Sequence, residues 1–182
     1  MVNSNYSSLG KPAIAGAVSV APVGTALPTD AKSELPEAWT CLGYISDSGL
    51  TNSNSPSSTA IKAWGGDELI RYVEDMEDTF QFNLVEVLNA EVLKLIYGEE
   101  NVTGTLESGI KIAAGDQIRE AHAWVIDIIM NNALKRVAIP SAAITSMSDI
   151  TYADTSIVGY DITITAKKDS DAKTHYEYII AD

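Results

Sequence analysis

Few residues in the sequence could act as a nucleophile or as a general base. The chain has two histidines, His122 and His175, and one cysteine, Cys41. A serine or cysteine nucleophile needs a neighbouring base such as histidine, and no nucleophile-elbow motif accompanies either histidine. A small cysteine on a strand is typical of a core residue, so we interpret Cys41 as core and not as half of a dyad with His122. We expect no catalytic residues and no enzyme activity.

Carboxylates gather between residues 67 and 78, where they could suggest a calcium site or a glycosidase pair. Their spacing matches neither an EF-hand loop nor a defined acid pair, and such a run is typical of a solvated hairpin tip. Gly65-Gly66 predicts a turn, because the other residues of a phosphate-binding loop are missing. We therefore expect neither a metal site nor a cofactor. The acidic residues are Asp67, Glu68, Glu74, Asp75, Glu77 and Asp78.

The net charge argues against a nucleic-acid-binding surface. The chain has 12 lysines and arginines against 25 aspartates and glutamates, which gives a formal charge of −13. Without basic residues between them, the three tryptophans and eight tyrosines are poorly suited to stacking on a nucleic acid. Aromatic residues on strands more often fill a core or a contact between subunits. We interpret Trp39, Trp64 and Trp124 in this way.

No stretch of the sequence reaches the roughly 20 apolar residues that a membrane-spanning helix needs. The most apolar segment, 121–130, is interrupted by His122 and Asp127. A single cysteine cannot form a disulfide within the chain. We therefore expect a protein that does not insert into a membrane and that folds in a reducing cytoplasm.

The elements that would position these residues are mostly strands. Asn89 as N-cap and Gly98 as a left-handed stop predict one short helix between them. Residues 75–78 are expected to join a strand over 69–74 to the next one as the tip of a hairpin. Short strands with a single helix indicate a mainly β fold, an antiparallel sandwich or barrel with one flanking α-helix. Alternating apolar and polar residues predict strands at 79–85 and 156–166. A long strand is also expected at 121–130, and the terminal hairpin returns at 174–180.

Composition divides the chain into two parts. Residues 1–38 are poor in charge and rich in Ala, Gly, Ser and Pro, so they predict an extended N-terminal arm before a single domain over 39–182. Within the arm, 13–23 could pair as a strand that Pro22 confines to a sheet margin or to another subunit. Residues 46–60 are nearly all small and polar and contain Pro56, so we expect a long irregular loop there.

The order of these features resembles a known family. Gly43-Tyr44-Ile45 and the turn at 47–49 lead into the Ser/Asn/Pro loop, which is followed by residues 61–66 (IKAWGG) and by the helix that closes on Tyr97-Gly98. A weaker likeness continues through Pro140, residues 150–152 and the terminal hairpin. Over residues 39–180 the chain resembles the major tail tube proteins of long-tailed, non-contractile bacteriophages.

This resemblance implies a structural role without catalytic residues. Its members form homohexameric rings that stack into a hollow tube for the passage of double-stranded DNA, and their partners are the tape-measure, tail-terminator and tail-tip proteins. The expected location is the virion tail, after assembly in the host bacterial cytoplasm. The loop over 46–60 and the N-terminal arm would reach the neighbouring ring.

Two sets of residues follow from that expectation. We expect much of the negative charge to lie on the inner face of the tube, because an acidic wall would gain nothing from the release of counterions from DNA and would repel the duplex. The expected contacts between rings or subunits are Val18, Val20, Asp47, Leu50, Asn52, Asn54, Pro56 and Trp64, and the expected lumen-facing residues are Glu74, Asp75, Glu77, Asp78, Gln81 and Asn83.

Two other functions remain open on the sequence alone. A subunit of a secretion-system tube or a pilus-like assembly would also form stacked rings. Neighbouring genes would distinguish it from a phage tail protein. A monomeric β-sandwich that binds carbohydrate or calcium would need an exposed aromatic cluster or a coordinating loop, and neither is evident in the sequence.

Overall fold

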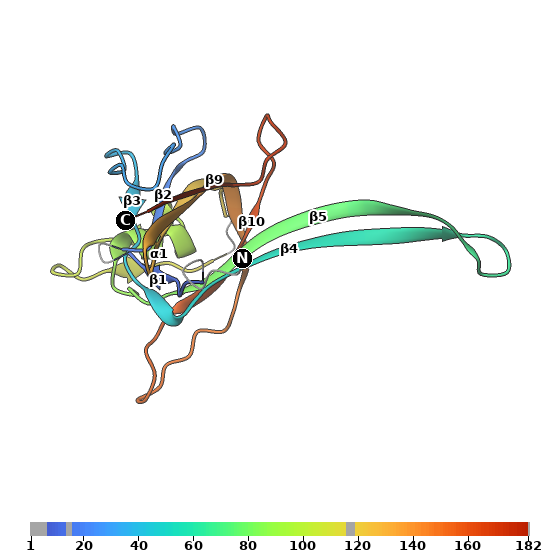
Figure 1. Cartoon of the computed structure of the whole chain (residues 1–182). Helices are drawn as coiled ribbons and strands as arrows, with labels where there is room; N and C mark the ends of the chain where they lie inside the picture. Colours follow the sequence, from blue (N-terminus) through green and yellow to red (C-terminus); the bar gives the residue numbers. More distant parts are fainter. Residues whose placement is uncertain (1–6, 14–15, 116–118, 182) are drawn as a thin grey trace.

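Strands are the main secondary structure of the computed structural model, which describes residues 7–13, 16–115 and 119–181 (Figure 1). The helical elements are α1 (Ala90–Tyr97) and the single-turn η2 (Glu99–Asn101). The strands are β1 (Lys11–Pro12), β2 (Val18–Pro22), β3 (Thr40–Cys41), β4 (Ile45–Lys62), β5 (Glu68–Leu84), β6 (Val102–Thr103), β7 (Lys111–Ile112), β8 (His122–Met130), β9 (Ala133–Met147), β10 (Tyr160–Ala166) and β11 (Tyr176–Ala181).

Nine of these strands form one antiparallel sheet in the order β3-β2-β8-β9-β10-β5-β4, with β1 also paired to β8 and β11 to β9. The sheet curls around a core. Strands β9 and β10 lie between β5 and β8 in the sheet, yet Phe82 on β5 contacts Trp124 on β8 edge to face, with ring centroids 6.0 Å apart. The sheet does not close, since β3 and β4 end the order. The predicted mainly β, antiparallel fold is confirmed.

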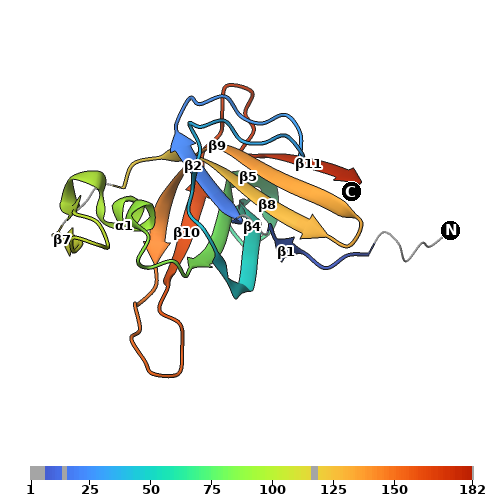
Figure 2. The ribbon, with the colours of Figure 1, turned by 90° about the vertical axis from the view of Figure 1, so that its left-hand side faces the viewer.

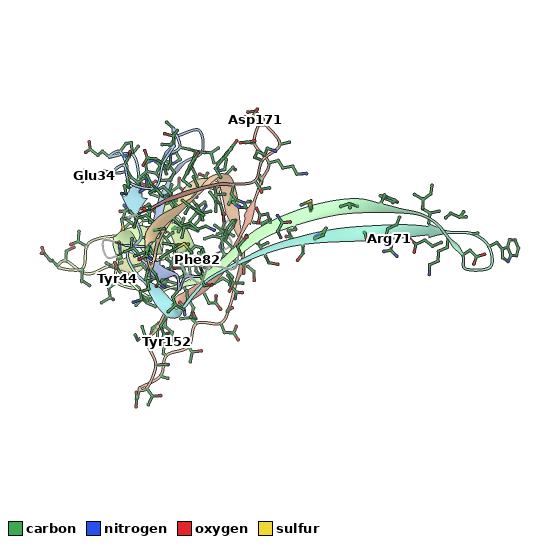
Figure 3. The ribbon with its side chains drawn as sticks, in the orientation of Figure 1. Glu34, Tyr44, Arg71, Phe82, Tyr152 and Asp171 are labelled. Atoms are coloured by element: carbon green, nitrogen blue, oxygen red, sulfur yellow. The ribbon has the colours of Figure 1, made fainter. Side chains whose placement is uncertain are left out.

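Buried and partly exposed residues alternate strictly on a strand that forms the core. On β10 every second residue is buried, and its inward Ile162 and Ile164 lie opposite Phe82 and Phe80 of β5. Phe82 is labelled inside the body in Figure 3. Each side chain of this kind contributes about 1.5–3 kcal/mol when it is fully removed from water. The same alternation points the intervening polar residues of β5 and β10 to the opposite face of the sheet.

Helix α1 covers one end of this core. It starts as predicted, with the Asn89 side chain accepting a hydrogen bond from the Glu91 backbone N–H. It ends at Gly98, whose backbone takes φ = 90° and whose N–H donates to the Lys94 carbonyl over 2.7 Å. Its buried face consists of Val92, Leu93 and Ile96. The predicted helix is confirmed.

The long hairpin of β4 and β5 projects far from the body (Figure 1). Its two strands pair from Ile45 opposite Leu84 to Lys62 opposite Glu68. The expectation of an irregular loop over 46–60 is therefore wrong, and residues 75–78 lie within β5 and not at a tip. A serine-rich segment needs no apolar face to pair when its partner supplies the backbone hydrogen bonds. Pro56 is tolerated because β4 is an edge strand, where a missing N–H costs no ladder bond on the outer side.

The N-terminal segment joins the main sheet. Strand β2 pairs with both β8 and β3, and its Val18 and Val20 are buried in the core, with 0% and 8% of their surface exposed. The expectation that Val18 contacts another subunit is wrong, because the body of the same chain buries it completely, whereas the role of Val20 in such a contact stays a prediction. Cys41 is exposed, contrary to its interpretation as core. The neighbouring Leu42, at 0% exposure, takes the inward position instead.

The connection from β2 to β3 is tied down by Arg136. The guanidinium, on β9, pairs with both carboxylate oxygens of Asp127 at 2.6 and 3.1 Å, and it donates to the backbone carbonyls of Asp30 and Ser33. Arg136 is only 5% exposed. The turn at Asp30 is itself hydrogen-bonded, since the Asp30 carboxylate accepts from the hydroxyl and backbone N–H of Ser33 and from the N–H of Lys32. These bonds lower the pKa of Asp30 to about 2. The connection thereby covers a second small apolar cluster on the outside of β8 and β9.

Candidate assembly surfaces

One face of the sheet is polar over four adjacent strands, and we call it the polar sheet face. These positions lie on the opposite side of β4, β5, β10 and β9 from the core residues. Several bond to one another: Gln81 Nε2 donates to Asp161 at 3.2 Å, and the Thr145 and Thr165 hydroxyls lie 2.8 Å apart. Its members, none of them basic, are Ser53, Thr79, Gln81, Asn83, Thr145, Asp161, Thr163 and Thr165.

A buried polar cluster holds the root of the long hairpin. Asp78 is 1% exposed and accepts hydrogen bonds from Asn52 Nδ2 at 2.8 Å and from His175 Nδ1 at 2.6 Å. The His175 ring also meets Phe80 edge to face at 5.3 Å. These residues come from β4, β5 and the connection between β10 and β11, so the cluster ties the hairpin to the C-terminal part of the chain. A buried carboxylate is tolerated here because both of its oxygens have donors.

Substituting Asp78 by alanine should lower the free energy of unfolding by about 1–3 kcal/mol, because two donors lose their buried acceptor. Urea unfolding followed by circular dichroism measures the effect. The matched control is Glu77→Ala, at the exposed residue that precedes Asp78 on β5. This substitution should change the free energy of unfolding by about 0.5 kcal/mol or less. Equal effects of the two substitutions would contradict the role of the cluster.

The far end of the hairpin is apolar and exposed. Trp64 stands at the turn with its whole side chain in solvent, at a relative exposure of 107%, while Ile61 and Ile70 face each other across the two strands at 50% and 59%. Tyr72, two residues further along β5, is 46% exposed. We call these four residues the hairpin head. The intervening stretch of β4, 51–58, consists of Thr, Asn, Ser and Pro, while the facing stretch of β5 exposes Val73 and Met76. The head lies where the hairpin is farthest from the body (Figure 1).

Comparison with known proteins shows the family of the chain. The family model described as phage tail tube protein matches residues 4–182, nearly the whole chain. The chain belongs to the phage tail tube protein family. No curated protein matches the sequence.

This family is structural, so the features of this tail tube protein that bear on function are its surfaces. In the described ranges, no group of three or more His, Cys, Asp or Glu residues is arranged to hold a metal ion. No helix among the described residues is long and apolar enough to cross a membrane.

The expected inter-ring residues of the tail tube protein fall into separate environments. Trp64 is at the hairpin turn, as an intermolecular contact requires, and Asp47, Asn54 and Pro56 are exposed along β4. Leu50 instead packs against the core of its own chain. Asn52 bonds to Asp78 within the root cluster. Their roles in contacts between subunits stay predictions.

The residues expected to face the lumen also lie in different environments. Gln81 and Asn83 lie on the polar sheet face, and the exposed Glu77 continues the same side of β5. Asp78 was expected in the lumen, and that is wrong, because alternation along β5 turns it to the core side, where His175 binds it. Glu74 and Asp75 lie in β5, but their side chains fall outside the described part of the structure.

Sequence reasoning missed two groups of surface residues. The alternation over 156–166 already separated Asp161, Thr163 and Thr165 from the apolar face, but it did not show that β10 pairs with β5 and extends one polar surface. Ile61 and Ile70 flank Gly65-Gly66, and apolar residues on both sides of a glycine turn were the signal for a paired, exposed head.

Proposed function

We propose that this tail tube protein self-assembles into stacked rings, six copies to a ring, that form the hollow tail tube of a long-tailed, non-contractile phage. The observation that carries the proposal is the long hairpin. Its exposed apolar head lies at the far end of two paired strands, outside the core of its own chain. Surface of this kind is typical of a protein–protein contact, and a projecting arm that reaches a neighbouring ring would bury it.

The polar sheet face supports a role as the wall of the channel. Its side chains are hydroxyls, amides and the Asp161 carboxylate. DNA is retained by cationic surfaces because their binding releases condensed counterions, and a face without lysine or arginine offers no such gain. Duplex DNA would therefore pass during delivery to the host cell without adhering to the wall. The partners on this proposal are copies of the chain itself and the tape-measure, tail-terminator and tail-tip proteins of the virion.

Assembly is tested by size-exclusion chromatography and negative-stain microscopy of the purified protein over a wide concentration range, with tail-initiation partners supplied. We expect rings or tubes with a central channel. A protein that stays monomeric at every concentration and with every partner would contradict the proposal.

Basic residues on the polar sheet face should convert the channel into one that retains DNA. The variant Ser53→Lys with Gln81→Lys places two cations on adjacent strands of this face, at positions that are exposed. Tubes of this variant should retain short linear duplex DNA at low salt and release it as salt rises, with a slope of about −0.9 per phosphate neutralised. Wild-type tubes should retain none.

The control for this experiment is Tyr152→Lys with Ile157→Lys. These residues are 76% and 79% exposed on the connection between β9 and β10, away from the polar sheet face. Retention of DNA by the control tubes to the same extent, or by wild-type tubes, would show that the polar sheet face does not line the channel.

A further inference from the structure

The hairpin head has a candidate receptor elsewhere on the same chain. An open groove of about 710 Å³ lies between α1 and β2, bordered by η2 and by residues 119–122. We call it the α1 groove. Its volume falls within the range of about 300–1,000 Å³ for sites that hold a drug-sized molecule, so it can accept an indole ring with its neighbours. Val20, Pro22 and Leu95 contribute to its lining.

Head and groove lie at opposite ends of the molecule. In Figure 1, α1 and β2 are on the side of the body away from the long hairpin. Figure 2, seen from that side, has α1 and β2 toward the viewer, with the hairpin behind the body. The head therefore cannot reach the groove of its own chain while the hairpin projects in this way, but the groove of a second copy is available to it.

The rim of the groove is acidic, and the hairpin turn carries an exposed lysine that could meet it. Lys62 lies two residues from Trp64 and opposite Glu68, whose carboxylate is paired with Arg71, and Asp67 lies in the same turn. The groove is bordered by four glutamates, and one of them, Glu91, is paired with Lys94 at 2.8 Å. Among the described residues of the lining, the remaining three glutamates, Glu99, Glu100 and Glu120, outnumber the remaining arginine, Arg119. A lysine that arrives with the head would thus meet an acidic rim.

We propose that the hairpin head of one copy docks in the α1 groove of a second copy in the next ring, with Trp64 as the anchor and Lys62 against the acidic rim. This inference rests on the proposed function and names the surface that the hairpin contacts. Joining two different patches of one chain is a heterologous contact, and repeated without closure it produces a filament. Because head and groove point in opposite directions, the contact also gives the tube a fixed polarity.

Cross-linking in assembled tubes tests the contact. In a Cys41→Ser background, Asp67→Cys puts a thiol in the hairpin turn without removing Trp64, and Glu99→Cys puts one at the groove. A short bismaleimide should join successive copies into a ladder on a denaturing gel. The yield should exceed that of the control pair, Asp67→Cys with Ile157→Cys, at least about tenfold, because thiols held at one interface have a millimolar effective concentration.

A charge exchange provides a second, independent readout. Lys62→Glu and Glu99→Lys should each reduce the sedimentable tube mass at a given protein concentration, and the double variant should recover most of it. Tubes that assemble normally but cross-link no better at Glu99 than at Ile157, or that show no recovery in the double variant, would overturn the docking site and leave the tube itself intact. Failure of the wild-type protein to form tubes under any condition would overturn both.

Discussion

Replacing residues 55–77 by an Asn-Gly turn is expected to abolish tube assembly while the body of the protein stays folded. The cut leaves Asn54 opposite Asp78 as the last strand pair, and Asn-Gly is the favoured two-residue connection for such a hairpin. The root cluster of Asn52, Asp78 and His175 is retained. The removed part contributes no residue to the buried core, so little hydrophobic stabilisation of the body is lost.

Both strands have to be shortened together in this experiment, because removing part of β4 alone would leave β5 without its partner. Circular dichroism and urea unfolding should report a body close to wild type in stability, whereas micrographs should contain no tubes. A matched control is Ser55→Ala with Ser57→Ala, which keeps the full hairpin and should assemble. Normal tubes from the shortened variant would show that the hairpin is not an assembly element.

The largest loss of stability is expected from Arg136→Ala. Removing the guanidinium leaves the Asp127 carboxylate and two backbone carbonyls, those of Asp30 and Ser33, without this donor. Breaking a buried ion pair from one side costs about 3–5 kcal/mol. The Asp127 side chain keeps 25% exposure, so water compensates in part and the lower end of that range, about 3 kcal/mol, is expected. Urea unfolding at neutral pH measures it.

The adjacent residue supplies the control. Lys135 pairs with Glu177 at 2.7 Å, but their side chains are 23% and 40% exposed. Exposed pairs of this kind contribute about 1 kcal/mol or less, so Lys135→Ala should cost far less than Arg136→Ala. If the two substitutions destabilise the protein equally, the Arg136 contacts do not hold the connection between β2 and β3 as described. Limited proteolysis of that connection gives a second readout, because it should be cut faster in Arg136→Ala.

Local patterns were sufficient wherever neighbours along the chain decide the outcome. The capping of α1 by Asn89 and its end at Gly98 depend on residues within a few positions. The alternation of β10 follows from the two-residue period of a strand beside one buried face. Composition and charge argued against a basic DNA-binding surface, and this stays a prediction, because a count of charges does not show where they lie.

Long-range pairing decided the rest. The stretch 46–60 has the composition of a loop, and only its register with β5 makes it a strand; backbone hydrogen bonds to a partner are invisible in its side chains. Cys41 is exposed and Leu42 is buried, because the direction of a side chain depends on which sheet face meets the core. Asp78 belongs to an acidic run in the sequence, yet His175, distant along the chain, binds it in a buried cluster.

What the sequence determined by itself was therefore the class of fold, the helix, the main strands and the resemblance to tail tube proteins, all of which rest on local periodicity and on the order of features. What only the tertiary structure decided was which polar residues share one face, which carboxylate is buried, and that the apolar residues around Trp64 end a projecting hairpin. The reason is physical: burial and exposure are set by contacts between residues far apart in the chain, and a strand's own side chains do not specify its partner.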